Sequence, residues 1–180
     1  MTSDFHSTLR RWRLLAALAA LLTLAACAVL DAGAPPPLEA NARWTVLPFA
    51  NHTETPLAGS RAAAIAAALL RSRGLGEVSE APGGGDDVVL ESGSRAPQAD
   101  PLAWARQSGA RYALGGSVDE WRYKVGVDGE PAVSLTAQII DVRDGRVLWS
   151  GVSGRSGWSR ESLGALAQKV LRELLAQGVR

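Results

Sequence analysis

The chain of 180 residues contains few of the side chains that usually build catalytic or metal-binding centres. It has one cysteine, Cys27, and two histidines, His6 and His52. One cysteine has no partner for a disulfide within the chain, and transition-metal sites need clusters of histidine and cysteine ligands. We therefore expect no intramolecular disulfide, no metal site and no cofactor.

Neither sign of charge is in excess, since the chain has 19 lysines and arginines and 18 aspartates and glutamates. Arg10, Arg11 and Arg13 lie near the start of the chain together with Asp4, so the remainder is nearly neutral. A nearly neutral chain lacks the basic surface that contacts nucleic-acid phosphates. Nucleic acid is therefore not an expected partner.

A long membrane-spanning run is also lacking. After the arginines comes an apolar run from Leu14 to Leu24, interrupted only by Thr23, and it is shorter than the about 20 apolar residues that span a bilayer. This arrangement is typical of a secretion signal. The run is followed by Ala-Ala-Cys, and the whole sequence Leu-Ala-Ala-Cys resembles the lipobox of bacterial lipoproteins. We expect cleavage after Ala26 and acylation of Cys27.

The rest of the chain is predicted to form a tether and one domain. Residues 27–41 hold the lipidated cysteine and three consecutive prolines, and a Pro-rich stretch stays extended. Residues 42–180 are expected to form a single α/β domain. By resemblance to the sorting rules of lipoproteins, Ala28 rather than aspartate after the cysteine favours an outer-membrane anchor.

Short apolar runs and helix stop signals predict the strands and helices of the first half of the domain. A buried strand is predicted from Trp44 to Phe49, and a helix of about 15 residues is predicted to end at Gly74. Asp100 and Pro101 favour the start of a second helix that runs to Gln107. Further strands are expected at residues 77–80 and 87–91.

The second half of the domain is predicted to be an antiparallel meander. Apolar residues alternate over 112–118 on one face of a strand, and the alternation then continues from 119 to 125 on the other face. Asp-Gly turns at 128–129 and 144–145 join this strand to two more. A last helix, with Ser159 as its cap, carries one apolar stripe. These elements predict a two-layer α/β sandwich with a mixed sheet covered by helices.

No catalytic centre is indicated by the sequence. His52 is the one histidine left after removal of the signal, and no Gly-x-Ser-x-Gly motif surrounds any serine. Asp119 and Glu120 are neighbours, and neighbouring strand residues point to opposite faces, so they are not expected to act as an acid/base pair. The chain is therefore not expected to be an enzyme.

Two tryptophans near the end of the chain have two possible roles. Trp149 and Trp158 flank a Gly- and Ser-rich segment. Tryptophan favours the membrane interface because its ring is apolar and its N–H still finds a polar partner. In a lipid-anchored chain either side chain could contact the membrane, and packing in the core is an equally supported alternative.

Three motifs resemble those of one lipoprotein fold family. The sequence Leu47-Pro48-Phe49 followed by Asn51 is similar to the "LPF-x-N" motif of the family that includes the amino-terminal domain of TolB, CsgG and LpoB. A "Y-x-L-x-G-x-V" strand is matched from Tyr112 to Val118. The family's hairpin motif is matched by Leu135, Ala137, Ile139, Asp141, Gly145, Val147, Leu148 and Trp149. The resemblance implies a TolB N-terminal-like fold.

Within this family, the lipobox and the absence of added pore-forming hairpins are most similar to the lipoproteins of Pel-type exopolysaccharide export. That resemblance implies a non-catalytic homo-oligomeric ring in the periplasm, anchored by lipid beside an outer-membrane export β-barrel. The ring would guide a cationic exopolysaccharide. Candidate residues for its acidic, polymer-facing surface are Asp119, Glu120, Asp128 and Glu130, with solvated loop ends as the alternative role. The alternative function is a module that activates or scaffolds a peptidoglycan enzyme.

Overall fold

The computed structural model describes residues 28–83, 100–126, 129–158 and 160–179. The predicted signal, Cys27, the predicted strand at 87–91, Asp128 and Ser159 lie outside these residues. The described residues form one mixed sheet and three helices, which confirms the predicted α/β class with a two-layer arrangement.

The sheet has seven strands in the order β1-β7-β6-β5-β2-β4, with the short β3 also paired to β5. Strand β2 is parallel to β4 and β5, whereas β5, β6 and β7 form the predicted antiparallel meander and β1 adds antiparallel to β7. The strands are β1 (Ala28–Ala32), β2 (Trp44–Val46), β3 (Ala50–Asn51), β4 (Val78–Glu80), β5 (Tyr112–Tyr123), β6 (Pro131–Asp141) and β7 (Val147–Ser156). The helices are α2 (Ala58–Ser72), α3 (Pro101–Gln107) and α4 (Leu163–Gly178).

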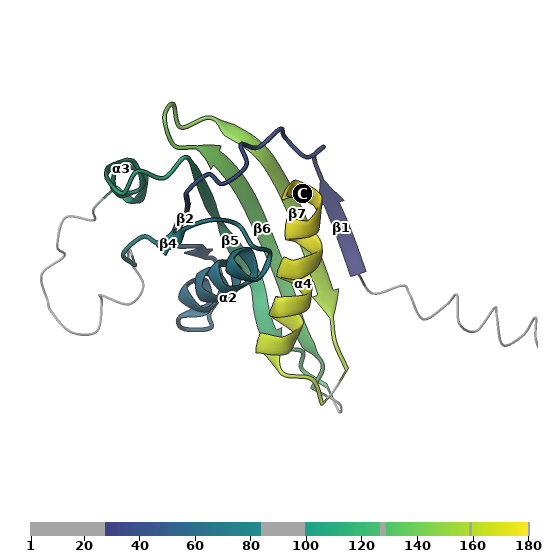
Figure 1. Ribbon diagram of the computed structural model, residues 1–180. Helices are drawn as coiled ribbons and strands as arrows, with labels where there is room; N and C mark the ends of the chain where they lie inside the picture. Colours follow the sequence, from purple (N-terminus) through teal and green to yellow (C-terminus); the bar gives the residue numbers. More distant parts are fainter. Residues whose placement is uncertain (1–27, 84–99, 127–128, 159, 180) are drawn as a thin grey trace, which may run out of the picture.

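Helices α2 and α4 cover one face of the sheet and enclose the main core (Figure 1). Both helices were expected, and α3 begins as predicted, with the Asp100 carboxylate accepting from the Leu102 amide. Helix α4 differs at its start, because Ser162 rather than Ser159 caps it by accepting from the Ala165 amide at 3.2 Å. Arg73 joins the two covering helices, since its guanidinium donates to carbonyl oxygens at the end of α4.

The family motifs mark places where the backbone packs closely. At Gly116 in β5 a Cβ atom would overlap the Thr136 carbonyl oxygen and lie 2.7 Å from the Phe49 ring. Asn51 instead organises the loop before α2, because its side chain donates to the Thr55 carbonyl and accepts from the Thr53 amide. The motif residues therefore explain the fold, and none of these contacts requires a ligand.

A β-bulge interrupts the pairing of β5 with β6 between Val118 and Glu120. The prediction that the strand switches faces after Val118 is wrong for this reason. Val118 and Trp121 both lie in the core beneath the helices, at 0% and 2% exposure. The extra residue of the bulge restores the inward direction for Trp121.

The segment predicted to be a free tether is instead bound to the sheet over much of its length. Residues Ala28–Ala32 form the edge strand β1, paired with β7 over five residues. The connection then crosses the end of the sheet, where the Glu39 amide donates to the Tyr112 hydroxyl at 3.0 Å. Because β1 starts one residue after Cys27, little free chain separates the expected lipid from the domain.

Trp149 holds the start of this connection. Its side chain is 3% exposed, its indole Nε1–H donates to the Gly33 carbonyl at 2.9 Å, and its ring packs on Gly178 of α4. Of the two roles left open by the sequence, the structure supports the core, and Trp149 is not exposed to contact a membrane.

Replacing Trp149 by phenylalanine should therefore release β1 before the rest of the fold. The variant keeps most of the ring but loses the hydrogen bond to Gly33, which is worth about 1 kcal/mol. Hydrogen exchange measured by mass spectrometry should show faster exchange over residues 28–33, with little change in β5 and β6. Trp104→Phe, in α3, is the matched control, and equal protection of β1 in both variants would contradict the prediction.

Candidate functional site

The face of the sheet opposite α2 and α4 is only partly covered. Helix α3 packs over one end of it, where Ala105 and Leu102 contact Ala113 and Ile140 in a second, smaller core. The side chains that follow along this face in β5, β6 and β7 are mostly half-buried or exposed. We call this uncovered region the open face.

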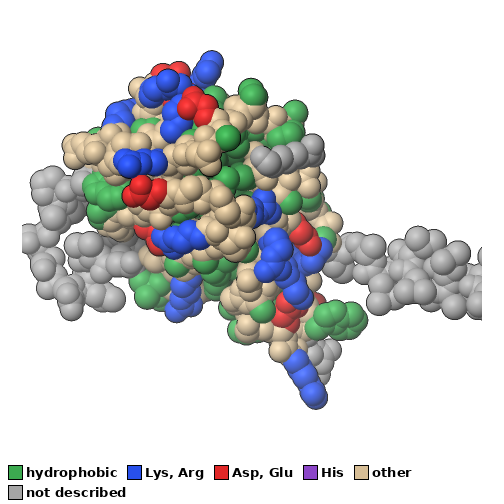
Figure 2. Space-filling view, in the orientation of Figure 1, with side chains coloured by type: hydrophobic (Ala, Val, Ile, Leu, Met, Phe, Trp, Pro, Cys, Tyr) green, Lys and Arg blue, Asp and Glu red, His purple; other side chains and the backbone are tan. Residues whose placement is uncertain are grey.

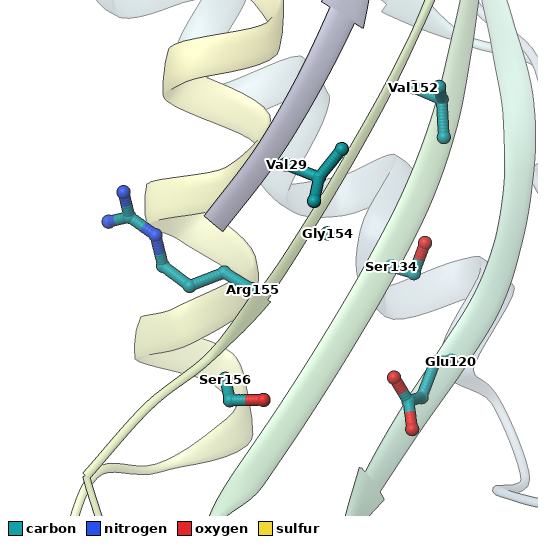
Figure 3. Close-up of a pocket in the computed structure, with 7 residues that line it drawn as sticks. All are labelled: Val29, Glu120, Ser134, Val152, Gly154, Arg155 and Ser156. Carbon is teal, nitrogen blue, oxygen red and sulfur yellow. The ribbon is translucent and has the colours of Figure 1, made fainter. Parts of the chain in front are cut away.

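Small polar side chains dominate the open face. They alternate with the buried residues of each strand, as expected for an antiparallel sheet with one solvated side, and they include Ser117, Ser134, Thr136, Gln138 and Ser150. Figure 3 shows one row across four strands, in which Val29, Gly154, Ser134 and Glu120 are successive neighbours. This row lines a shallow hollow together with Val152, Arg155 and Ser156.

Asp119 lies at the bulge on the open face and accepts three side-chain hydrogen bonds. Its Oδ1 accepts from the Ser117 hydroxyl at 2.9 Å and lies 3.1 Å from His52 Nδ1. Its Oδ2 accepts from the Thr136 hydroxyl at 3.0 Å. The carboxylate is thus fixed in position while 36% of the side chain stays exposed.

This cluster contains serine, histidine and aspartate, but its order differs from that of a catalytic triad. In a triad the histidine lies between the nucleophile and the acid. Here the carboxylate of Asp119 lies between Ser117 and His52, so the serine hydroxyl is bound to the acid and not to a base. The geometry is suited to holding a carboxylate on the surface rather than to activating a nucleophile.

The bulge also brings Glu120 to the same face as Asp119. The prediction that these neighbours point to opposite faces is wrong, because Glu120 is paired with Ser134 and lines the hollow beside it. Its carboxylate accepts from Arg122 Nε at 2.8 Å. Of the other candidate acids, Glu130 is exposed beside the β5–β6 turn, and Asp128 lies outside the described residues. The structure thus brings together two of the four candidates.

Trp158 differs from Trp149 in being 76% exposed. It follows β7, at the end of the sheet where Tyr123 and Val125 are also exposed, at 50% and 100%. Strand β1 begins near this end too, because Ala28 pairs with Arg155. Exposed apolar side chains and the attachment point of the expected lipid therefore lie toward the same end of the molecule.

A partly buried ion pair lies at the other end, beside α3. Arg111 Nη1 lies 2.6 Å from Asp141 Oδ1, and Arg111 Nε donates to Glu39 at 2.8 Å. The guanidinium of Arg111 lowers the pKa of Asp141, and the Arg143 amide adds to this effect while burial opposes it. Asp141 in turn raises the pKa of Arg111. The pair ties the connection after β1 to β5 and β6.

Metal-binding clusters and membrane-spanning helices are both absent from the described residues. No group of three or more histidine, cysteine, aspartate or glutamate side chains in that part of the chain could hold a metal ion. No helix among the same residues is long and apolar enough to cross a membrane.

No family model and no curated protein matches the sequence. Lipoprotein GNA1162 from Neisseria meningitidis has a similar structure, with a TM-score of 0.51 and 24% identity, covering 75% of this chain and 99% of that one. This likeness shows the fold alone: the chain has the same α/β domain architecture as that protein.

Two solved structures define the family more narrowly. Both are dodecamers of PelC from Paraburkholderia phytofirmans, one of them a single-substitution variant. Each is 39% identical to this chain with a TM-score of 0.71, and the matches cover 84% and 85% of this chain and 99% of PelC. The chain therefore belongs to the PelC family, which confirms the predicted resemblance to the lipoproteins of Pel-type export.

Proposed function

We propose that this chain is a non-catalytic, lipid-anchored subunit of an outer-membrane machine that exports a Pel-type exopolysaccharide. Several copies form a ring in the periplasm, and the ring guides the polymer to an outer-membrane β-barrel. The observation that carries the proposal is the 39% identity to dodecameric PelC over nearly the whole of that chain. Homo-oligomers with closed rings are common, and such a ring needs no catalytic centre in its subunits.

The open face supports a role in contacting the polymer. Asp119 and Glu120 lie side by side on it, and hydroxyl and amide side chains surround them. Carboxylates attract the ammonium groups of a partly deacetylated polysaccharide, while hydroxyls and amides exchange hydrogen bonds with its sugar rings. Because the whole chain is nearly neutral, such guidance depends on local segregation of charge. In this proposal Glu130, and Asp128 beside it in sequence, extend the acidic surface.

The exposed end of the sheet supports a defined orientation on the membrane. Trp158, Tyr123 and Val125 are exposed near the end at which Ala28 follows the lipidated cysteine. Tryptophan at a membrane interface gains from burying its ring while its N–H stays hydrated. We assign membrane contact to Trp158 and not to Trp149, which the core encloses.

The double variant Asp119→Asn, Glu120→Gln should export less polymer than the natural chain. Both replacements keep the side-chain size and remove the charge, so the attraction for ammonium groups should fall and cell-surface polymer should drop about three- to tenfold. The measurement is complementation of a strain that lacks this gene, with surface polymer quantified by a lectin or an antibody. Binding of the purified protein to a deacetylated hexosamine polymer should fall in parallel at low salt and converge at high salt.

The matched control is Glu77→Gln, because Glu77 is an exposed acid beside β4 and away from the open face. It should complement like the natural chain. Equal polymer on cells with and without the gene would contradict the proposed function. Full export by the double variant would contradict the assigned polymer surface and leave the export role standing.

A further inference from the structure

The hollow on the open face has an apolar half that attraction for ammonium groups does not explain. Val29 of β1 and Val152 of β7 line this half, and they are 71% and 40% exposed (Figure 3). Val29 pairs directly with Gly154, and Val152 lies two residues before Gly154 on β7. The two valines therefore flank a position that has no side chain, and together they form an exposed apolar surface.

A free hydroxyl lies beside this apolar surface. Ser134 of β6 pairs with Gly154, and its hydroxyl has no hydrogen-bond partner among the described residues. A Cβ atom at Gly154 would lie 3.4 Å from Ser134 Oγ, so glycine keeps this hydroxyl accessible. The hollow has a volume of about 340 Å³, and ligand sites of this small size combine an apolar lining with a few polar groups. It can therefore receive one substituted face of a sugar unit.

Two carboxylates border the hollow along the neighbouring row of the sheet. This row runs from Asp31 through Val152 and Thr136 to Asp119, because residues directly opposite each other on paired strands share one face. Asp31 is exposed, was not among the predicted acids, and has no side-chain partner in the described part of the chain. Neighbouring strands lie about 4.8 Å apart, so the two carboxylates are separated by roughly 14 Å, with the apolar surface between them.

The basic side chains near the hollow are engaged by other protein groups. Lys124 Nζ donates to the Ser156 hydroxyl at 2.6 Å, and Arg122 is held by a carboxylate of its own strand. The Arg155 guanidinium lies 3.0 Å from Glu173 of α4, and its side chain is directed away from the hollow (Figure 3). Further basic side chains lie on the helix-bearing side of the molecule (Figure 2). A cationic chain is therefore attracted to the open face rather than to the helices.

A partly deacetylated amino-sugar polymer has groups that match both halves of this site. Its ammonium groups match the carboxylates, whereas each remaining N-acetyl group has a methyl group, an amide N–H and a carbonyl oxygen. The methyl group fits the apolar surface, and the amide can exchange a hydrogen bond with the free hydroxyl of Ser134. A fully deacetylated polymer would leave the apolar surface uncovered, and a fully acetylated polymer would leave the carboxylates without cations.

We propose that the hollow is a subsite for the N-acetyl group of an amino sugar. Val29 and Val152 contact the acetyl methyl group, and Ser134 binds the amide. Asp31 and Asp119 hold ammonium groups of sugar units on either side. This inference rests on the proposed function and adds a specificity to it, since the subunit selects polymer that keeps some of its acetyl groups. It also gives β1 a part in binding the polymer.

Binding of two chitosan oligomers to the full lipidated protein in detergent tests the subsite. Both oligomers have the same length and charge, but half of the amino groups are acetylated in one and formylated in the other, so they differ only in the acyl methyl groups. The natural chain should bind the acetylated oligomer about fourfold more tightly, as expected for burial of one methyl group. The double variant Val29→Thr, Val152→Thr keeps the branched side chains that suit a strand and should lose this preference. Isothermal titration calorimetry measures the affinities, and circular dichroism checks the fold.

Val147→Thr is the matched control, because Val147 is 47% exposed on the same strand, outside the hollow, and its replacement should keep the preference. Asp31→Asn should weaken the binding of both oligomers by the same factor, about two- to fivefold, since it removes a charge and leaves the acetyl contact. Equal binding of the two oligomers by the natural chain, or a threonine double variant that keeps the preference, would overturn the subsite while the export role stands. Export of polymer by cells without the gene would overturn the proposed function itself.

Discussion

An Asp141→Asn variant should be less stable than the natural chain by about 2–3 kcal/mol at neutral pH, because it removes the buried partner of a partly buried ion pair. The Asp141 side chain is 8% exposed and that of Arg111 is 18% exposed, so water replaces little of the lost interaction. The Glu39 carboxylate stays 2.8 Å from Arg111 Nε, which keeps the cost near the low end of the range for such pairs. Chemical denaturation monitored by tryptophan fluorescence measures the difference.

The loss should also depend on pH in a defined direction. Arg111 lowers the pKa of Asp141 in the folded chain below its unfolded value of about 4. The stabilisation by the carboxylate is therefore complete above that unfolded value and is lost as the pH falls through the lower folded value. The natural chain and the Asn variant should differ by a constant amount from neutrality to about pH 5 and then converge in acid.

Asp144→Asn is the control for this prediction. The Asp144 side chain is 56% exposed, and its Oδ2 lies 3.9 Å from Arg146 Nε. Removing the charge of Asp144 should therefore lower the free energy of unfolding by no more than about 0.5 kcal/mol. A difference for Asp141→Asn that stays constant into strong acid would show that the charge of Asp141 is not its cause.

Much of the fold follows from local sequence signals. The helix of 15 residues before Gly74, the Asp100 cap of α3 and the antiparallel meander were all predicted correctly. In each case the signal is short in range, since a turn, a cap or an alternating run lies within the element that it defines. The apolar stripe of α4 is equally local, although its cap is Ser162 and not Ser159.

The predictions that proved wrong concern features that depend on pairing with a neighbouring strand. The change in alternation after Val118 is visible in the sequence, but a change of face and a bulge predict the same pattern until the register with β6 is known. That register decides whether Asp119 and Glu120 form one acidic surface. The signal for a bulge is an alternating apolar pattern that shifts by one residue and then continues to a large apolar side chain. Here that side chain is Trp121, which is buried.

Strand β1 was missed for a similar reason. Its five residues precede a Pro-rich stretch, and most of its side chains are exposed, so no apolar pattern marks it. The strand is held by backbone pairing with β7 and by the hydrogen bond from Trp149 to Gly33. The role of Trp149 therefore becomes clear only once its partner, distant in sequence, is located.

Loss of the lipid should have the largest effect of any change to this chain. A form with Cys27→Ser, exported by an ordinary cleavable signal so that processing does not depend on the cysteine, should move almost completely from the membrane to the soluble periplasmic fraction. Each buried CH₂ of an acyl chain contributes about 0.8 kcal/mol, so several chains anchor stably where one chain is marginal. No helix among the described residues is long and apolar enough to cross a membrane.

Fractionation of cells and flotation with liposomes measure this redistribution. Trp158→Ala in the lipidated chain is the control, and it should stay with the membrane because one interfacial side chain adds little to several acyl chains. In the Cys27→Ser background the same substitution should reduce the residual liposome binding, if Trp158 contacts lipid as proposed. A Cys27→Ser form that still sediments with the outer membrane would show that protein contacts hold it there. Because β1 begins at Ala28 and is paired with β7, a lipid on Cys27, as proposed, would act directly on the edge of the sheet and would fix which end of the domain faces the membrane.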